Sequence, residues 1–397
     1  MASGRNTAVG IDVGTYQVKV IVGELDPKSD KAVPRIIGSG IAESRGMRHG
    51  FITNQADAVK SIKAAVSAAE KSAGFPIKKA YVSVGGVGLS AIISFGSVVT
   101  TKADSEITEL DLKRVIEESE KELPNSYIQN RKIIHTVPLE YRVDGKKVLG
   151  RPLGLKGVKL ESRVLYITSL AHHLTDLLNA IDDADIEVLD VTAAPIAASL
   201  VTLTKTQKIA GCILANIGSE TTSIIVFENN MPVSMEMFQI GSNDITNDLA
   251  LGLKISIEEA EQIKLGHGRI GEFSKRKIEE IVVARLSDIF DLIEDHLRKI
   301  DRNGLLPAGI ILTGGGSGIP NIEELAKMAL KLPSKQSRLR FEGNSKNLSA
   351  DFEWAVAYGL ILLNLSDNPE GEGYPPTFEP FKKAGLQLWK WIKQFLP

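Results

Sequence analysis

The chain has 397 residues, 43% of them apolar and 24% charged, so it can bury more than one hydrophobic core, and two or more domains are expected. Its formal net charge of −2 provides no broad basic field, which excludes nucleic acid as an expected partner. The single cysteine, Cys212, cannot form an internal disulfide, and no apolar run reaches the roughly 18 residues that would predict a membrane span.

The first predicted element is a pair of short β-branched strands joined by a glycine turn, between residues 10 and 22. This segment has a near copy 204 residues later without gaps, because residues 10–15 lie over 214–219 and residues 20–22 over 224–226. In each copy the glycine permits a positive φ and close approach to a ligand. The repeat predicts two similar halves that face each other; a chance pair of unrelated hairpins is the alternative.

An alternation of helix and strand follows the first hairpin. Residues 56–73 predict an amphipathic helix and residues 79–84 a strand. Residues 85–164 break this pattern with alternating strands and one helix, which Thr108 and Asp111 open as a capping pair. We interpret this stretch as an inserted small domain.

The alternation resumes with a strand at residues 164–170, a helix from His172 and a strand at residues 186–191. The second half is expected to open at Ile209. A helical subdomain is predicted within it.

That subdomain covers residues 244–299, with a capping box at Ser256 and a long helix from Lys275. A strand at residues 309–312 then runs into a Thr-Gly-Gly-Gly turn, and a helix follows from Asn321.

The C-terminal region has three predicted parts. Residues 354–365 form an apolar helix, and residues 366–381 form a tether rich in proline, glycine and glutamate. At about 100° per residue, six large apolar side chains of the last segment fall within one arc of about 160°. They are Leu388, Trp389, Trp391, Ile392, Phe395 and Leu396. With lysines opposite, they predict a helix lying on an anionic lipid surface; docking on the protein's own core is the alternative.

Three separated turns could jointly hold a nucleotide. In the first, Gly14 leaves backbone N–H groups free for a phosphate, Thr15 offers a hydroxyl and Asp12 can hold Mg²⁺ through water. The second offers Gly218, Ser219 and Thr221, and the third is Gly314, Gly315 and Gly316, with room for a base and ribose. Each turn alone predicts an ordinary tight turn, but their order along the chain favours a nucleotide site.

The order of these three turns along the chain resembles that of the actin and Hsp70 ATPase superfamily. Within this superfamily, the chain resembles the FtsA family of bacterial division proteins. The motifs that carry this resemblance are residues 46–50 (GMRHG), Gly85-Gly86, residues 135–141 (HTVPLEY), residues 152–155 (PLGL), residues 261–264 (EQIK) before residues 266–268, and the C-terminal helix. The resemblance implies an α/β, actin-like fold of two RNase H-like halves around a nucleotide cleft. It also implies an inserted small α+β subdomain and a helical subdomain.

The resemblance divides the chain into six parts. These are subdomain 1A (residues 1–84, 165–205 and 352–366), inserted subdomain 1C (85–164), subdomain 2A (206–241 and 305–351), helical subdomain 2B (242–304), a flexible linker (367–383) and a membrane-targeting helix (384–397).

The resemblance also implies ATP and Mg²⁺ as cofactors, with Asp12 as the metal residue. The implied nucleotide-binding residues are Asp12, Gly14, Thr15, Tyr16, Asn216, Gly218, Ser219, Glu220, Thr221, Glu261, Lys264, Gly314, Gly315 and Gly316. For Glu261 and Lys264, a solvated surface pair is the alternative. Asn216 replaces an aspartate of many relatives, and Ala194 stands where hydrolytic relatives often have a glutamate, so slow or absent hydrolysis is expected.

FtsA-like proteins polymerise, tether the FtsZ ring to the inner membrane and recruit later division membrane proteins. The resemblance therefore implies a peripheral protein on the cytoplasmic face of the cell membrane at the division site. The C-terminal tail of FtsZ would meet the helical subdomain at Arg285, Lys275 and Arg276, where a solvated basic helix is the alternative. Rival interpretations are a PilM-like pilus-assembly module, a sugar or acetate kinase, and an Hsp70-type chaperone.

Overall fold

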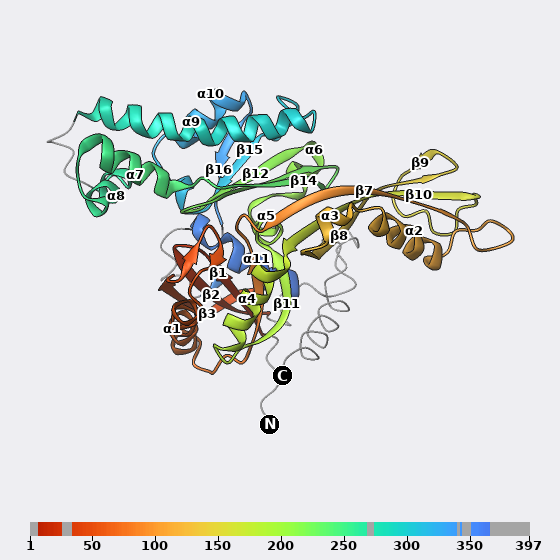
Figure 1. Cartoon of the computed structure of the whole chain (residues 1–397), viewed down its shortest axis with the longest axis horizontal. Helices are drawn as coiled ribbons and strands as arrows, with labels where there is room; N and C mark the ends of the chain where they lie inside the picture. The colour runs from red at the N-terminus through yellow and green to blue at the C-terminus, as the bar shows by residue number, and fades with distance from the viewer. Residues whose placement is uncertain (1–6, 26–33, 268–273, 340–341, 344–350, 366–397) are drawn as a thin grey trace.

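The computed structural model describes residues 7–25, 34–267, 274–339, 342–343 and 351–365 (Figure 1). The predicted linker at residues 367–383 and the predicted membrane-targeting helix at residues 384–397 lie outside these ranges. Among the described residues, no helix combines the length and the apolar character that crossing a bilayer requires.

The first half is built on a six-stranded sheet with the order β11-β6-β1-β2-β3-β17. Its strands are β1 (Thr7–Val13), β2 (Gln17–Glu24), β3 (Arg35–Glu43), β6 (Lys79–Val84), β11 (Glu187–Ala193) and β17 (Glu342–Gly343). Helices α1 (Gln55–Ala73), α4 (Ala171–Asp182), α5 (Ala194–Thr202) and α11 (Ala355–Leu365) pack against it, and β4 (Met47–Arg48) pairs with β5 (Phe51–Ile52) beside it. Helix α1 begins where Asn54 accepts a hydrogen bond from the Asp57 N–H, and it ends at Gly74 in the left-handed conformation.

The second half is built on a five-stranded sheet with the order β14-β13-β12-β15-β16. Its strands are β12 (Cys212–Ile217), β13 (Thr222–Glu228), β14 (Met231–Phe238), β15 (Ile310–Thr313) and β16 (Ser334–Gln336). Helices α6 (Lys205–Ala210), α7 (Ser242–Leu253), α8 (Ile257–Lys264), α9 (Lys275–Lys299) and α10 (Ile322–Leu330) accompany it. The helical subdomain α7–α9 lies at the top of Figure 1, with the first half below.

The internal repeat is confirmed by the register of the two hairpins. Strands β1 and β2 pair Gly10 with Ile21, and strands β12 and β13 pair Leu214 with Ile225, which are the same positions after the offset of 204 residues. The parallel neighbours also correspond, because Ile11 pairs with Val82 of β6 and Ala215 pairs with Leu312 of β15. Two unrelated hairpins would not be expected to share both the pairing within the hairpin and the pairing with the parallel neighbour strand.

The inserted region forms a separate four-stranded sheet with the order β7-β10-β8-β9, which extends to the right in Figure 1. Its elements are β7 (Leu89–Val99), α2 (Glu109–Lys121), α3 (Asn125–Ile128), β8 (Arg131–Val143), β9 (Lys146–Val148) and β10 (Lys159–Leu170). Thr108 and Asp111 form the predicted capping box of α2. The strand expected to begin at residue 164 begins at Lys159, because β10 pairs continuously with β7 from there. The predicted boundary at residue 164 therefore falls inside one strand.

Two other expectations differ from the structure at element ends. Ile209, where the second half was expected to open, lies in α6, and the first strand of that half begins at Cys212. Ser256 caps α8 by accepting a hydrogen bond from the Glu259 N–H, which is one of the two bonds of the predicted capping box. Neither difference changes the order of the elements.

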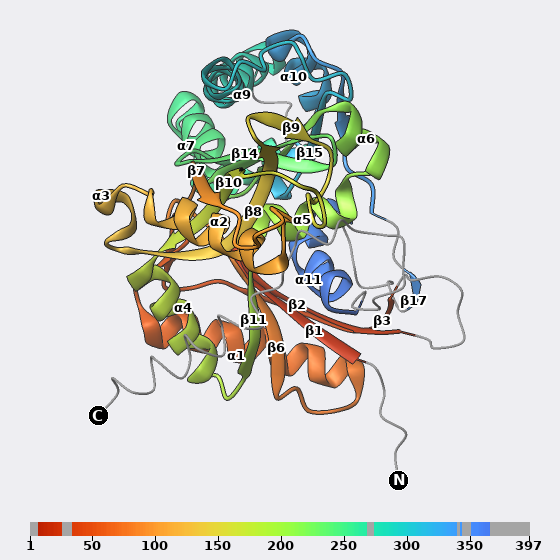
Figure 2. The same ribbon diagram turned by 90° about the vertical axis from the view of Figure 1, so that its right-hand side faces the viewer.

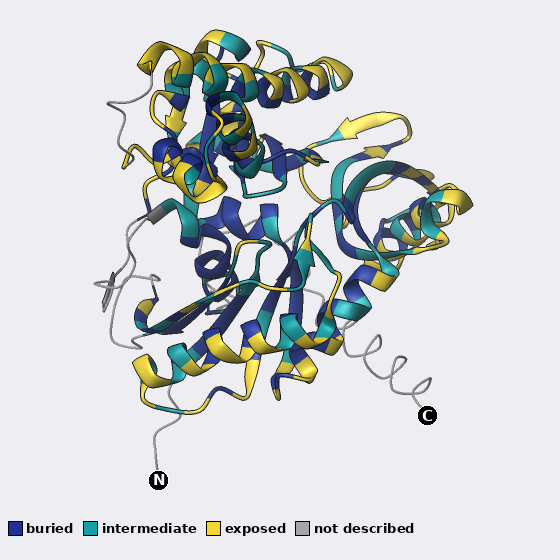
Figure 3. Cartoon of the chain, turned by 60° about the vertical axis from the view of Figure 1, so that its left-hand side comes forward, coloured by how far each residue is buried: buried dark blue, intermediate teal, exposed yellow. Residues whose placement is uncertain are grey.

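The hydrophobic core runs through all three sheets. One buried cluster joins side chains of the first half, such as Val82, to Leu165 of the insert and Leu214 and Met235 of the second half. Figure 3 shows this buried interior enclosed by exposed helices. In Figure 2 the insert faces the viewer, and its strands contact β14 of the second half and β11 of the first. The insert is therefore packed into the common core.

Candidate functional site

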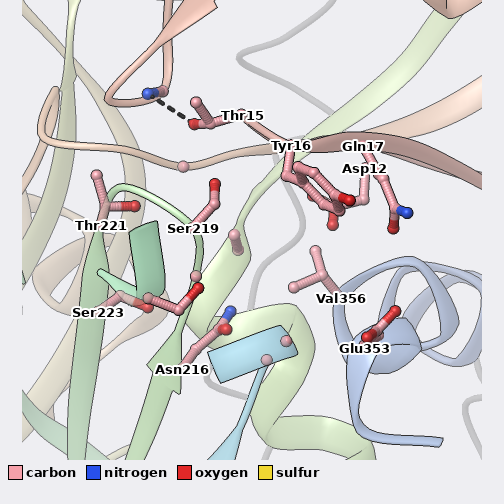
Figure 4. Close-up of a pocket in the computed structure, with 18 of the residues that line it drawn as sticks. Asp12, Thr15, Tyr16, Gln17, Asn216, Ser219, Thr221, Ser223, Glu353 and Val356 are labelled. Atoms are coloured by element: carbon pink, nitrogen blue, oxygen red, sulfur yellow. Dashed lines mark hydrogen bonds between the residues drawn. The ribbon is translucent and has the colours of Figure 1, made fainter. Parts of the chain in front are cut away.

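A cleft of about 420 Å³ lies between the two halves. Figure 4 shows the side chains of Asp12 and Thr15 facing those of Asn216 and Ser219 across it. Most of the predicted nucleotide-binding residues line this cleft: Asp12, Gly14, Thr15, Tyr16, Asn216, Gly218, Ser219, Thr221, Glu261, Lys264, Gly314 and Gly315. Residues that are about 200 to 300 positions apart in the sequence thus share one cavity.

The two phosphate turns have the same backbone geometry. The Gly14 N–H donates to the Gln17 carbonyl oxygen at 3.1 Å, and the Gly218 N–H donates to the Thr221 carbonyl oxygen at 2.8 Å. A Cβ atom would lie only 2.8 Å from that oxygen at Gly14 and 2.9 Å from it at Gly218. The close approach of that oxygen favours glycine in both turns, although neither glycine has the positive φ that the sequence allowed. Ser219 adds a hydroxyl to the cleft wall.

The Asp12 carboxylate accepts a hydrogen bond of 2.7 Å from the Ser83 hydroxyl. Desolvation raises the pKa of this carboxyl group, while the Ser83 hydrogen bond and the charge of Lys19 oppose that rise. A carboxylate in a cleft that also holds several hydroxyl groups is a donor set suited to a hydrated Mg²⁺ ion. Asp12 is the residue that would hold the ion through water.

The third turn follows β15 and enters the short helix η2 (Gly315–Gly318). Gly314 has a φ of +83°, and a Cβ there would lie 2.6 Å from the Ile217 carbonyl oxygen and would collide with the Asn216 side chain. The turn thus packs directly on the end of β12. Gly316 does not line the cleft; it packs against Ile217.

Glu261 and Lys264 form a hydrogen-bonded network with Thr246 on the helical side of the cleft. The Lys264 ammonium group donates to Glu261 at 2.6 Å and to the Thr246 hydroxyl at 2.9 Å, and Thr246 donates to Glu261 at 2.6 Å. Lys264 is 6% exposed, and desolvation lowers its pKa. Lys264 is therefore not a solvated surface residue, whereas the Glu261 side chain is 32% exposed and lines the cavity. Contact of the pair with a nucleotide stays a prediction.

Several cleft residues were missed by the sequence analysis as site residues. They are Gly85 and Gly86 after β6, Gln17 and Lys19 on β2, Ser223 on β13, Ser242 and Asn243 at the start of α7, and Phe352 and Glu353 in η3 (Asp351–Trp354). Gly85 and Gly86 follow β6 as Gly315 and Gly316 follow β15, and both strands are the parallel neighbours of the repeated hairpins. This correspondence is the signal that could have found them.

Glu220 is not among the lining residues of the cleft. Its carboxylate accepts a hydrogen bond of 2.6 Å from the His49 N–H of the first half. Tyr16, by contrast, lines the cleft and is 60% exposed.

Arg285, which the resemblance implies as a contact for the FtsZ tail, lies on α9 and is already paired within the chain. It donates two hydrogen bonds to the Asp248 carboxylate, at 2.7 and 3.1 Å, and lies 3.2 Å from Asp288. Of the other two, Lys275 is exposed and Arg276 donates to Glu280 at 2.8 Å.

Comparison with known proteins decides the family. The cell division protein FtsA of Bacillus subtilis (strain 168) is 33% identical to this chain over 375 residues, which cover 89% of this chain and 82% of that protein. The chain belongs to the FtsA family. The family model described as cell division protein FtsA matches residues 213–359, and the SHS2 domain inserted in FtsA matches residues 90–168. The insert is therefore an SHS2 domain, and its match runs past residue 164 into the rest of β10.

Solved structures show that this FtsA-family chain has the expected actin-like fold. The type IV pilus biogenesis complex of PilM and PilN contains a chain with a TM-score of 0.67 and 18% identity, covering 90% of this chain and 98% of that one. MreB5 of Spiroplasma citri bound to AMPPNP has a TM-score of 0.52 and 14% identity, covering 99% of this chain and all of that one, 100%. These identities support a shared fold alone.

Two positions in the cleft of this FtsA-family member carry neutral side chains. Asn216 and Ala194 both line the cavity. They are the positions at which the resemblance led us to compare this chain with relatives that have an aspartate and a glutamate. The start of α5 is fixed there because the Ala193 N–H donates to His135 Nε2 of the insert at 3.0 Å. Burial lowers the pKa of His135 to about 4, so the ring stays neutral and keeps accepting this bond near pH 7.

Proposed function

We propose that this FtsA-family protein binds ATP with Mg²⁺ in the cleft between its halves and uses the nucleotide to hold them together. The observation that carries this proposal is the convergence of the two mirrored glycine turns on one cavity, opposite the Glu261–Lys264 pair. The turns offer backbone N–H groups and hydroxyls to phosphates, and that pair offers oriented polar groups to the ribose and base. Bound Mg²⁺ would neutralise phosphate charge beside Asp12.

The same cleft supports a structural role for ATP rather than fast turnover. Asn216 cannot accept a proton, and the methyl side chain of Ala194 has no polar group to orient an attacking water. We therefore expect the purified protein to hydrolyse fewer than about one ATP per second, the low end of typical enzyme rates. A phosphate-release assay that measured faster turnover would contradict this role.

We further propose that the protein polymerises and tethers FtsZ to the inner face of the cell membrane, where it recruits later division proteins. Family membership supports this role, and the six apolar residues within 384–397 would supply the lipid contact. Half-burying six such side chains contributes roughly 1 kcal/mol each, which ordering of the helix largely offsets. One copy should bind weakly, and a filament should bind strongly through avidity.

Removal of residues 384–397 is expected to abolish sedimentation with anionic vesicles while leaving ATP binding unchanged, because the tail is separate from the cleft in sequence. Electron microscopy on lipid monolayers with ATP should show filaments for the full chain and bare lipid for the truncated one. A Trp389→Ala/Trp391→Ala variant provides a milder test with an intact chain length. Vesicle binding that persists in both variants would show that lipid attaches elsewhere.

We propose that the acidic tail of FtsZ binds near the start of α9, at Lys275, Arg276 and Arg285. Arg285 can bind a carboxylate of the tail only if it shares or breaks the hydrogen bonds that it donates to Asp248. Asp248→Asn should therefore raise tail-peptide affinity and Arg285→Glu should lower it. Unchanged affinity in Arg285→Glu would remove this residue from the contact.

A further inference from the structure

A short hairpin of the first half reaches across to the second half beside the cleft. Residues 47–52, here called the His49 hairpin, pair Met47 with Ile52 and Arg48 with Phe51. His49 and Gly50 form its tip with φ values of 48° and 85°. Two positive φ values in a two-residue turn match the twist of paired strands, so the tip is a defined turn.

Two residues of the hairpin, Arg48 and His49, contact Glu220 of the second half. The His49 N–H donates to the Glu220 carboxylate at 2.6 Å, and His49 Nδ1 lies 3.3 Å from the Glu220 carbonyl oxygen. Arg48 Nε lies 3.6 Å from the other carboxylate oxygen. The side chains of Glu220 and His49 are only 17% and 27% exposed, so their contacts are shielded more than an ordinary surface ion pair. The Arg48 side chain is 69% exposed, and its contact contributes less.

The same hairpin is fixed on the first half at the edge of the phosphate site. The Gly50 N–H donates to the Thr15 hydroxyl at 3.1 Å, the bond drawn as a dashed line in Figure 4. The Val87 N–H donates to the His49 carbonyl oxygen at 3.2 Å, and a Cβ on Gly86 would lie 2.6 Å from that oxygen. The hairpin therefore moves with the first half, and so with Thr15 and Gly86, which line the cleft.

Glu220 is equally tied to the phosphate site of the second half. It lies between Ser219 and Thr221, which line the cleft, in the turn closed by the Gly218–Thr221 hydrogen bond. The backbone of the same turn accepts a bond from the Asn243 N–H at the start of α7, through the Ser219 carbonyl oxygen. Any movement that separates the two phosphate turns must stretch the bonds from the His49 hairpin to Glu220.

We propose that the contact between Glu220 and the His49 hairpin is a latch that holds the two halves closed and sets the rate at which nucleotide leaves. This inference rests on the proposed nucleotide site. It gives Glu220 a role across the cleft instead of a direct contact with the nucleotide. It also explains the second glycine of the GMRHG segment, because a side chain at Gly50 would collide with the Gly86 backbone and displace the hairpin.

The first test measures the release of a fluorescent ATP analogue from the full chain by stopped flow. Glu220→Gln keeps the shape of the side chain but removes its charge, and release should become about tenfold faster. Glu187→Gln is the matched control, because it removes the carboxylate of an exposed ion pair with Lys79, outside the cleft lining. Release from Glu220→Gln at the unmodified rate would overturn the latch.

The second test locks the contact covalently. A His49→Cys/Glu220→Cys double variant places two thiols at the latch, and the native Cys212 is fully buried and so should not interfere. After loading with the analogue and oxidation, release should slow at least about 100-fold, and reduction should restore it. Equal release before and after reduction of the cross-linked protein would contradict the proposed closure.

The two tests separate the latch from the site on which it depends. If the unmodified chain bound no analogue, the nucleotide site and the latch would both be rejected. If the unmodified chain bound the analogue and only the release rates of the variants stayed unchanged, the latch alone would be rejected.

Discussion

Replacement of Ser219 by aspartate is expected to weaken ATP binding at least about 100-fold. Ser219 lies in the second phosphate turn and lines the cleft, so the new carboxylate would face the phosphates. Like charges held close in an interface cost several kcal/mol, and each 1.4 kcal/mol corresponds to about a tenfold change in affinity. The lost hydroxyl contributes much less, since a neutral hydrogen bond is worth roughly 1 kcal/mol.

Ser219→Asn separates charge from shape, because asparagine has nearly the same size as aspartate and carries no charge. Its affinity for ATP should fall by roughly tenfold or less. Equilibrium titration with a fluorescent ATP analogue measures both variants, and thermal unfolding without nucleotide checks that the fold is intact. If Ser219→Asp and Ser219→Asn lost the same affinity for ATP, the size of the new side chain would explain the loss and its charge would not. That result would contradict a position of the phosphates beside this turn.

The sequence predicted the two halves and their glycine turns because the repeat keeps one offset through strand, turn and strand. A strand register follows directly from such spacing, and Gly14 and Gly218 occupy matching turns as a result. Gly85 and Gly86 were missed as site residues because they follow β6, which β3, β4, β5 and α1 separate from the repeated hairpin. The chain between that strand and the hairpin differs in length between the two halves, so no single offset aligns it.

The sequence could not show which charges have partners. Glu220 stands in a phosphate turn and was assigned to the nucleotide, yet its partner His49 is 171 residues away. Arg285 was chosen for its charge, but Asp248 on α7 already pairs with it. Such contacts depend on how separate elements pack together, which local pattern does not encode. The burial of Lys264 has the same origin, since α7 supplies Thr246 against α8.

Lys208→Met is expected to raise the free energy of unfolding by about 2 kcal/mol at pH 7. Lys208 lies on α6 and is only 6% exposed, and burial lowers its pKa from 10.5 to about 8. At about 1.4 kcal/mol per pKa unit, keeping the ammonium group charged costs the folded state roughly 3 kcal/mol. Its position 4.9 Å from the centre of the Phe227 ring returns about 1 kcal/mol through a cation–π interaction. Desolvation therefore outweighs the attraction, and methionine fills a similar volume without charge.

The pH dependence of this difference distinguishes desolvation from a packing effect. Because the pKa of folded Lys208 lies below its unfolded value, the unfolded chain holds more protons between about pH 8 and 10.5. The penalty is thus fully present below pH 8, and the unmodified chain gains stability as the pH rises through this window. Denaturant unfolding should show the advantage of Lys208→Met shrinking between pH 8 and 10, whereas a packing effect would leave it constant.

Lys60→Met serves as the control, because the Lys60 side chain is 78% exposed and its removal should change stability by less than about 0.5 kcal/mol. A Lys208→Met variant less stable than the unmodified chain at pH 7 would mean that the Phe227 contact outweighs the cost of burial. The position matters beyond stability, since Lys208 and Phe227 belong to the half that carries the second phosphate turn. Phe227 lies in the core cluster shared by both halves. If Lys208→Met raised the free energy of unfolding and left the rate of nucleotide release unchanged, the stability of this core would not control the closure of the cleft.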